Sequence, residues 1–283
     1  MLPILSLLLA GNLQTVFVIL MENVNWPEVH GSAHAPYLNG TLLRMGAHAE
    51  RYFNPPGVHP SEPNYLWLEA GTDFGIRDDK DPAAHRLSGD HLVAQLGKAG
   101  ISWKAYQEGI APDECPVASH GLYAAKHDPF VFFEDVTRDP RFCTAHVRPL
   151  PELEKHLQTG SAARYNFITP DLCNDMHGAR GCRRDWIRNG DDWMALWIPR
   201  ILASPQYKAG GAIFITWDEG EHDSDGPIGM IVVSPLAKPG FSSDEHYTHS
   251  SFLRTVQEIF GVEPLLGDAA NAKDLSALFK TFP

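Results

Sequence analysis

The sequence predicts an α/β fold in which a mostly parallel central sheet carries helices on both faces. A nearly continuous apolar, β-branched run at 14–21 and two further segments that read as buried strands, 165–168 and 212–217, support this prediction. Strands that are buried on both faces show such runs because neither face needs polar residues. Helix-compatible segments separate the runs, and alternating strands and helices favour parallel pairing. A further apolar run at 228–233 is expected to join the same sheet.

The remaining elements follow from local signals along the chain. Gly100 and Gly261 each follow a helical pattern and are expected to end it, since glycine readily adopts the left-handed conformation at a helix C-terminus. Residues 71–85 are charged and irregular, which is typical of a functional loop. The expected helices are 37–48, the run after Ser61, 90–99, 151–157, 191–203 and 249–260, and the further short strands are 49–53 and 101–106.

The length of 283 residues suits a single domain, expected over 11–283. Within it, 109–148 has the cysteines, prolines and aromatic residues of a loop-rich insertion. Residues 1–10 are apolar but too short to span a bilayer, and they are read as a remnant of a signal peptide. Because no other stretch is long and apolar enough to cross a membrane, stable membrane insertion is not expected.

Four cysteines occur, without zinc-finger spacing, at Cys115, Cys143, Cys173 and Cys182. Proximity along the chain favours pairing the first with the second and the third with the fourth. Four cysteines allow three connectivities, and buried free thiols are the alternative.

Charge excludes one class of function. Asp and Glu number 35 against 23 Lys and Arg, a formal net charge of −12. A nucleic-acid-binding surface is basic, so this balance argues against a nucleic-acid partner and is compatible with binding cations.

Ser61 lies in a proline-rich turn before an apolar, helix-compatible run. Pro60 and Pro63 bracket it, and a proline in the first helical turn gives up no required N–H donor. Ser61 is therefore expected at a helix N-terminus, where unpaired backbone N–H groups and the helix dipole favour an anion such as phosphate. A serine at this position often serves as an N-cap, so a capping role is the alternative.

Polar residues follow the predicted buried strands. These residues are Glu22 and Asn23, then Asp175 and His177, then Asp218 and Glu219, and finally His246 and His249. The carboxyl ends of parallel strands meet at one edge of a sheet, where α/β folds bind ligands. Carboxylates, an amide and imidazoles together form the ligand set of a hard or borderline divalent cation. Each motif alone could be a turn or a solvated loop, and it is their recurrence after successive strands that predicts a site.

Five motifs in this order resemble a known family. They are Val18-Ile19-Leu20-Met21-Glu22-Asn23, His59-Pro60-Ser61-Glu62-Pro63-Asn64-Tyr65, Thr169-Pro170-Asp171-Leu172-Cys173-Asn174-Asp175-Met176-His177, Trp217-Asp218-Glu219-Gly220 and Tyr247-Thr248-His249-Ser250-Ser251. Together they look like the phosphoesterase family of acid phosphatases and non-haemolytic phospholipases C, within the alkaline phosphatase-like superfamily. The resemblance covers about 15–279 and implies an alkaline phosphatase-like fold.

The resemblance also implies roles for individual residues. By this similarity Ser61 is the nucleophile and Asn64 donates to a phosphoryl oxygen. Residues that match the family's metal-holding positions are Glu22, Asn23, Asp218 and Glu219; those in its catalytic polar motifs are His177 and His249, with Asp175, His59 and His246 as additional candidates.

Two departures from the family's pattern bear on function. Val24-Asn25-Trp26 stands where the phospholipases commonly have Ser-Phe-Asp, which favours the small-phosphatase branch. Asp171 and Gly178 differ from the Asn and Asp expected beside Asp175, so the role of that loop is less defined.

The sequence therefore predicts metal-dependent hydrolysis of phosphate monoesters through a phosphoserine on Ser61, with a small phosphoester as substrate. The divalent metal could be calcium, magnesium, zinc, manganese or iron. A phosphodiesterase or phospholipase C on the same fold is the first alternative, and a non-catalytic cation-binding surface protein is another.

A metal-independent serine hydrolase using Ser61 and His59 is disfavoured. No Gly-x-Ser-x-Gly elbow occurs, and a histidine two residues away across Pro60 is poorly placed as a base. A signal remnant and two disulfides together would indicate a secreted or periplasmic protein.

Overall fold

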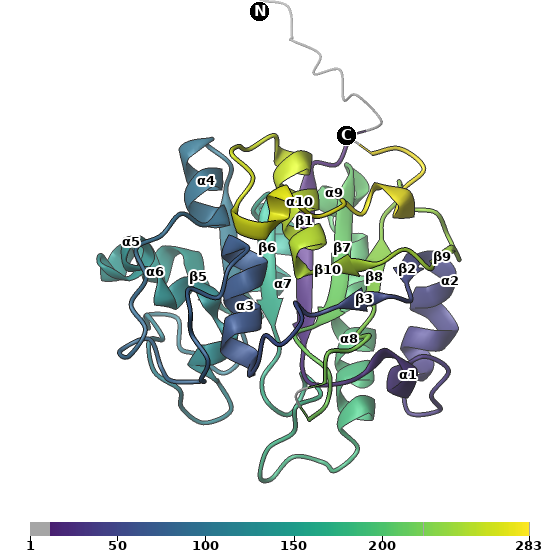
Figure 1. The fold of residues 1–283 in the computed structure, drawn as a ribbon, viewed down its shortest axis with the longest axis horizontal. Helices are drawn as coiled ribbons and strands as arrows, with labels where there is room; N and C mark the ends of the chain where they lie inside the picture. Colours follow the sequence, from purple (N-terminus) through teal and green to yellow (C-terminus); the bar gives the residue numbers. More distant parts are fainter. Residues whose placement is uncertain (1–11, 223, 283) are drawn as a thin grey trace, which may run out of the picture.

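An eight-stranded sheet forms the centre of the computed structural model, which describes residues 12–222 and 224–282 (Figure 1). The strand order is β5-β4-β6-β1-β7-β8-β2-β9. The strands span Thr15–Met21 (β1), Ala47–Ala49 (β2), Trp103–Gln107 (β4), Val147–Pro149 (β5), Tyr165–Thr169 (β6), Gly211–Trp217 (β7), Met230–Val233 (β8) and Ser242–Ser243 (β9). Only β8 runs against its neighbours among these strands, so the predicted mostly parallel sheet is confirmed. The predicted signal remnant at 1–10 lies outside the described residues.

Strand β1 lies in the middle of the sheet between β6 and β7. All seven of its residues are buried, as its unbroken apolar sequence predicts. Its register pairs Thr15 with Gly211 and Met21 with Trp217, so β1 and β7 end side by side. The residues that follow the two strands are therefore forced into contact.

Helices cover both faces of the sheet, as predicted (Figure 1). Helices α3, α4 and α10 pack together, and α7, α8 and α9 form a second packed group. The helices span Trp26–Val29 (α1), Leu43–Met45 (α2), Ser61–Ala70 (α3), Leu92–Lys98 (α4), Glu134–Thr137 (α5), Pro140–His146 (α6), Pro151–Thr159 (α7), Trp186–Ala203 (α8), Pro205–Lys208 (α9) and His249–Phe260 (α10).

The helix predicted over 37–48 is shorter and irregular. A π-helical turn at Leu38–Leu42 leads into α2, which ends at Met45. Gly46 is extended there, and a Cβ at this position would lie 2.6 Å from the carbonyl oxygen of Val232. The chain thus enters the sheet directly as β2, which a continuing helix would prevent.

The strand predicted over 49–53 is in fact two strands in different sheets. Strand β2 ends at Ala49, and β3 (Tyr52–Phe53) pairs in parallel with β10 (Tyr247–Thr248) in a separate two-stranded sheet. This pairing brings the segment before Ser61 next to the start of α10.

The segment 109–148 is more regular than its composition predicts. It contains α5, α6 and two 3-10 turns, Ala125–His127 and Pro129–Phe132, and β5 at its end pairs with β4. Disulfides join Cys115 to Cys143 and Cys173 to Cys182, the pairing favoured by proximity along the chain.

Helix α3 is buried on nearly all sides, with only Trp67 partly exposed among its ten residues. At its C-terminal end, Glu69 accepts a hydrogen bond from His91 Nδ1 at 3.0 Å, while His91 Nε2 lies 3.0 Å from Asp135 Oδ1. Burial lowers the pKa of His91, but the hydrogen bonds to Asp135 and Glu69 outweigh it and raise the pKa to about 9. Because both ring nitrogens face carboxylates, His91 is a buried imidazolium that ties α3 to α4 and α5.

The variant His91→Gln is expected to lose stability in a pH-dependent way. The folded-state pKa of about 9 exceeds the unfolded value of about 6.5, so the charge-dependent stabilisation is complete below pH 6.5 and disappears as pH rises through 9. Chemical denaturation at pH 6, 7.5 and 9.5 should show the gap between wild type and variant shrinking by on the order of 3 kcal/mol. A gap that does not change with pH would contradict the imidazolium assignment.

Candidate active site

The ends of β1 and β7 bring together two of the predicted pairs of polar residues, Glu22 with Asn23 and Asp218 with Glu219. The backbone N–H of Asp218 donates to the carbonyl of Met21 at 3.0 Å, and that of Glu22 donates to the carbonyl of Asp175 at 2.7 Å. Asn23 then adopts a left-handed conformation with φ 40°, which asparagine tolerates better than most residues. Its backbone N–H donates to Asp218 Oδ1 at 3.1 Å, so three loops meet at one point.

Ser61 faces this point from the first turn of α3. Its side chain is buried, and its Oγ donates to Glu22 Oε2 at 3.2 Å. Pro60 is the N-cap residue, and Asp79 Oδ1, not the Ser61 hydroxyl, accepts the backbone N–H of Glu62 in the first turn of α3, at 3.0 Å. The hydroxyl is therefore directed at the acidic residues instead of closing the helix, which answers the capping alternative.

Negative charge is concentrated at this point beyond what the surrounding protein compensates. Glu22, Asp175 and Asp218 are each 0% exposed. Burial raises the pKa of all three carboxyls well above the ordinary range, and repulsion adds to it, from Asp175 on Glu22 and from Glu22 on Asp218. Oδ2 of Asp175 and Oδ2 of Asp218 have no hydrogen-bond partner within the described part of the chain.

The side-chain oxygen of Asn23 adds to this crowding of oxygens. It lies 3.1 Å from Glu22 Oε2 and 3.2 Å from Asp218 Oδ1. A rotation of the amide by 180° would turn both contacts into hydrogen bonds, and a cation shared by the three oxygens would satisfy them equally. Buried oxygens without donors are the kind of donor set that hard divalent cations take, so these residues fit the predicted metal.

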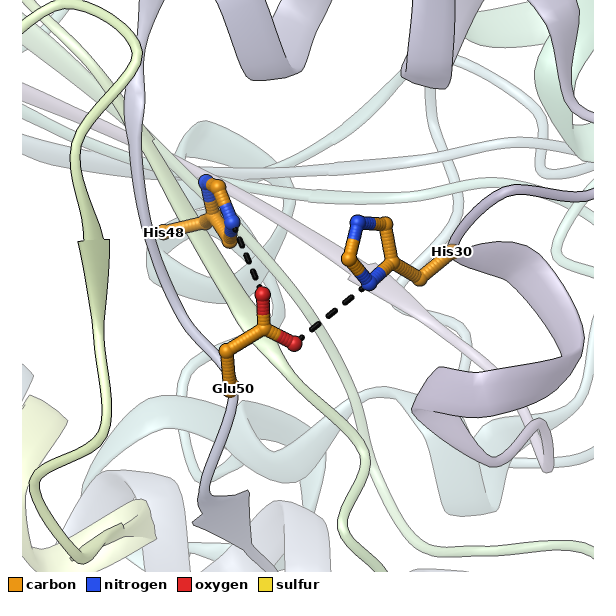
Figure 2. Close-up of side chains that lie close together, drawn as sticks. All are labelled: His30, His48 and Glu50. Carbon is orange, nitrogen blue, oxygen red and sulfur yellow. Dashed lines mark hydrogen bonds and ion pairs between the residues drawn. The ribbon is translucent and has the colours of Figure 1, made fainter.

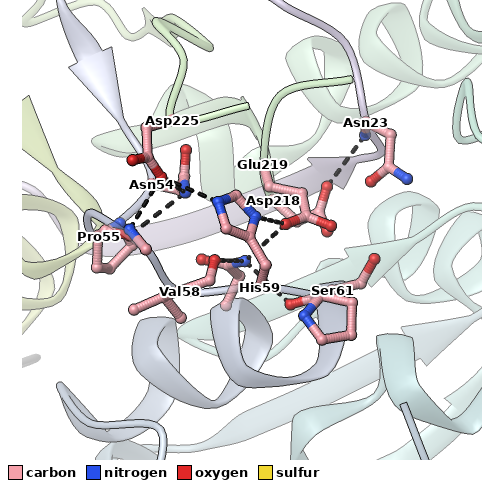
Figure 3. A network of polar contacts seen from close by, with 12 residues as sticks. Asn23, Asn54, Pro55, Val58, His59, Ser61, Asp218, Glu219 and Asp225 are labelled. Carbon is pink, nitrogen blue, oxygen red and sulfur yellow. Dashed lines mark hydrogen bonds and ion pairs between the residues drawn. The ribbon is translucent and has the colours of Figure 1, made fainter. Parts of the chain in front are cut away.

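Figure 3 shows a second layer of contacts around Glu219, which follows Asp218 and is also buried. His59 lies between two carboxylates: its Nδ1 makes a short contact with Glu219 Oε2, and its Nε2 lies 2.9 Å from Asp225 Oδ1. Burial lowers the pKa of His59, but the two carboxylates outweigh it and raise the pKa. Because both of its ring nitrogens are engaged by carboxylates, His59 anchors Glu219 and is not available as a base for Ser61.

Asn64 holds the loop that precedes α3. Its Nδ2 donates to the backbone carbonyls of Val58 at 2.8 Å and Pro60 at 3.2 Å, and it lies 3.4 Å from Glu219 Oε2. Its Oδ1 is buried without a hydrogen-bond partner among the described residues. The amide NH₂ is thus engaged by protein, and donation to a phosphoryl oxygen stays a prediction.

The three remaining predicted histidines, His249, His177 and His246, differ in their contacts with this centre. His249 is fully buried, with Nε2 2.6 Å from the carbonyl oxygen of Asp218 and Nδ1 3.1 Å from Tyr52 Oη, and burial lowers its pKa to about 4. His177 follows Asp175, whose Oδ1 accepts its backbone N–H at 2.8 Å. His246 is exposed and packs against Phe53, with ring centroids 4.8 Å apart.

Sequence patterns missed three residues of the site. Tyr65 donates to Glu22 Oε1 at 2.6 Å, and His127 Nε2 lies 3.2 Å from the same oxygen. The His127 ring stacks on Tyr65 with centroids 5.1 Å apart, and its Nδ1 lies 3.5 Å from Asp175 Oδ2. His127 comes from the 109–148 segment, in which no strand end marks it as functional.

Lys126 is the third residue that was missed. Its Nζ donates to Asp79 Oδ2 at 2.6 Å. Burial lowers the pKa of Lys126, but the charges of Glu22 and Asp79 outweigh it and raise the pKa. The same positive charge lowers the pKa values of Glu22 and Asp175, so Lys126 is the cation that partly offsets the buried carboxylates.

A family model, the Phosphoesterase family, matches residues 32–263, which is most of the chain. The chain belongs to the Phosphoesterase family. The predicted enzyme class, a hydrolase acting on phosphoric ester bonds, and the predicted family are thereby confirmed.

Two proteins that are similar to this phosphoesterase are named as phosphatases. It is 28% identical over 264 residues to a phosphatidylinositol-3-phosphatase of Mycobacterium tuberculosis, covering 93% of this chain and 82% of that protein. It is also 28% identical over 222 residues to a phosphate-repressible acid phosphatase of Penicillium chrysogenum, covering 74% of this chain and 51% of the fungal protein. The chain thus spans about half the length of the fungal relative.

The fold is also found in solved structures. A Vibrio parahaemolyticus protein of the alkaline phosphatase superfamily superposes with a TM-score of 0.58 at 11% identity, covering 90% of this chain and 68% of that one. The predicted alkaline phosphatase-like fold of the phosphoesterase is confirmed.

A cavity of about 780 Å³ opens beside the acidic centre of the phosphoesterase. Asn23 and His177 line it, and Arg184, Trp186 and Ile187 line it from the segment at the start of α8. The cavity wall therefore combines apolar surface with a cation next to Asn23, the neighbour of Glu22.

The variant Asp218→Asn is expected to stabilise the metal-free protein. Burial raises the pKa of Asp218 above its unfolded value, so at neutral pH the charged carboxylate opposes folding, and this penalty fades as pH falls through the raised pKa. After exhaustive chelation, the variant should show a higher free energy of unfolding than wild type at pH 7.5, with a smaller advantage at pH 5.

Asp192→Asn is the matched control for this prediction. Asp192 is on the surface and pairs with Arg183 and Arg188, which lower its pKa against the opposing effect of burial. Its replacement should leave stability unchanged or slightly reduced. Equal destabilisation by both substitutions would show that the Asp218 carboxylate does not oppose folding.

Proposed function

We propose that this chain hydrolyses phosphate monoesters with Ser61 as the nucleophile, through a phosphoserine intermediate. The observation that carries the proposal is the Oγ of Ser61, which is buried at the start of α3 and directed at Glu22, beside Asp175 and Asp218, each of which has one oxygen without a hydrogen-bond partner among the described residues. The names of the two relatives, a phosphatidylinositol-3-phosphatase and an acid phosphatase, support cleavage of a monoester.

A divalent metal ion belongs to this proposal. Glu22, Asn23, Asp218 and Glu219 would hold it, because the three carboxylates are buried and the Asn23 oxygen lies close to Glu22 and Asp218. When bound, such an ion neutralises phosphate charge and lowers the pKa of a coordinated hydroxyl.

The residues of the chain perform the remaining tasks. Ser61 Oγ attacks phosphorus, the P–O bond to the substrate alcohol breaks, and the alcohol leaves with a proton; water then cleaves the phosphoserine and restores Ser61. The positive end of the α3 dipole and the ammonium of Lys126 stabilise the charge on the transferred phosphoryl group. Because phosphoryl transfer depends mainly on position and charge, these contributions account for most of the catalysis.

The two histidines of the proposed catalytic set have different tasks. His177 Nδ1 lies 2.8 Å from the carbonyl oxygen of Gly178, to which only a protonated nitrogen can donate, so Nε2 of the neutral ring accepts a proton. Burial lowers the pKa of His177, which keeps the ring neutral. We assign it the proton transfers with water and the alcohol. His249 positions Asp218 through its backbone carbonyl.

A phosphodiesterase or phospholipase C on the same fold remains the alternative. The two disulfides support a secreted or periplasmic location. No helix within 12–222 and 224–282 is both long enough and apolar enough to span a bilayer.

Ser61→Ala is expected to reduce the hydrolysis of p-nitrophenyl phosphate by about 10³-fold or more, because the attacking oxygen is removed. Ser88→Ala, which alters an exposed serine, should retain full activity. Thermal unfolding of both variants should match wild type. Full activity of the Ser61 variant would exclude Ser61 as the nucleophile, and the absence of any hydrolysis by wild type supplied with metals would favour a non-catalytic cation-binding protein.

Chelation and a substrate series test the rest of the proposal. Activity should be lost on treatment with EDTA and return with one of the five candidate divalent metals, since the carboxylates alone repel phosphate. The metal-restored enzyme should hydrolyse p-nitrophenyl phosphate faster than bis-p-nitrophenyl phosphate or phosphatidylcholine. A preference for the diesters would replace the monoesterase by the alternative, and undiminished activity after exhaustive chelation would exclude the metal mechanism.

A further inference from the structure

Two histidines and a glutamate converge at a place outside the catalytic network. His30 Nδ1 lies 3.4 Å from Glu50 Oε2, and His48 Nε2 lies 3.0 Å from Glu50 Oε1. One ligand atom from each residue lies within 4.8 Å of the other two. Figure 2 shows both imidazole rings directing a nitrogen toward the carboxylate.

The carboxylate of Glu50 is held from two further sides. Trp26 Nε1 donates a short hydrogen bond to Oε2, and Ser242 Oγ donates to Oε1 at 3.0 Å. The indole of Trp26 also packs beside both imidazoles, with centroids 5.1 Å from His30 and 5.9 Å from His48. Donors that fix a carboxylate in this way are typical of the residues that surround metal ligands.

We propose that His30, His48 and Glu50 form a second metal site, which takes a zinc-type divalent cation. Two imidazole nitrogens with one carboxylate oxygen are ligands that zinc prefers, whereas the oxygen-rich catalytic centre suits harder cations as well. The side chains are 40%, 8% and 25% exposed, respectively, so the site is open to solvent and leaves room for water as a further ligand.

The position of the three ligands indicates a structural role. His30 directly follows α1, the first helix after Glu22 and Asn23. His48 and Glu50 belong to β2 and its extension, whose backbone N–H groups donate to Phe241 and Ser243. A bound zinc would therefore tie α1 to the β2–β9 edge of the sheet and fix the segment that leads out of the catalytic centre.

Zinc binding to the full chain tests this proposal independently of catalysis. Asp218→Asn serves as a background in which the catalytic centre lacks one of its proposed ligands. After equilibrium dialysis against Zn²⁺ and elemental analysis, this variant should retain one zinc per chain, and zinc should raise its unfolding temperature.

Added substitutions on that background locate the zinc. Either His30→Ala or Glu50→Gln should abolish the bound zinc or weaken it by at least about tenfold, and Ser242→Ala should weaken it by about tenfold through loss of a donor to Glu50. His34→Ala is the matched control, because His34 is also an exposed histidine close to α1 but pairs with Asp185. It should bind zinc as the background does.

Two results would overturn the proposal. One is the absence of bound zinc in the Asp218→Asn protein, and the other is zinc that persists unchanged in both the His30→Ala and the Glu50→Gln proteins. Unfolding curves in the absence of zinc identify any variant that is misfolded, and Glu50→Gln keeps one acceptor oxygen and nearly the same side-chain volume. Neither result depends on whether the Ser61 chemistry is correct.

Discussion

The burial of Glu22, Asp175 and Asp218 at one edge of the sheet is the constraint on which the rest of the structure depends. Burying an ionised carboxylate without a partner costs several kcal/mol, so a fold that buries three together must fix them by other means. The fixing is done by the backbone: β1 and β7 pair along their whole length, and hydrogen bonds from Asp218 to Met21 and from Glu22 to Asp175 leave the carboxyls no way to separate. The pairing and burial of the apolar strands thus offset the free-energy cost of burying these carboxyls.

The same constraint explains the surroundings of Ser61. Because α3 is buried almost entirely, its first turn cannot move away from the carboxylates, and Gly71 ends the helix in a left-handed conformation against the backbone of Leu266. Tyr65 donates to Glu22 from the same helix, and its ring stacks on His127, so the glutamate is held from α3 and from the 109–148 segment. A nucleophile in such a place owes its orientation to packing, which is what positional catalysis requires.

The sequence predicted those features that a local pattern of residues specifies. Unbroken apolar runs predicted the buried strands, and the polar residues directly after them predicted that Glu22 and Asp218 meet at one edge of the sheet. The prolines around Ser61 predicted its place at a helix N-terminus. Lys126 and His127 were not, because they follow no strand and reach the site only through the folding of an apparently irregular segment. The short strand β9 was missed for a related reason: it is defined by pairing with β2 and has no pattern of its own.

The two proposed metal sites, the catalytic carboxylates and the His30, His48 and Glu50 cluster, lie on different structural elements. The oxygens of the proposed catalytic metal site come from the ends of buried parallel strands, where burial removes water from the carboxylates. The histidines of the second cluster come from α1 and an edge strand, where partial exposure keeps one ring accessible and Trp26 and Ser242 orient the carboxylate. Since α1 follows Asn23 by only two residues, whatever orders the second cluster also limits the motion of the first. Stability at the edge of the sheet and geometry at its catalytic end are therefore coupled through one short segment.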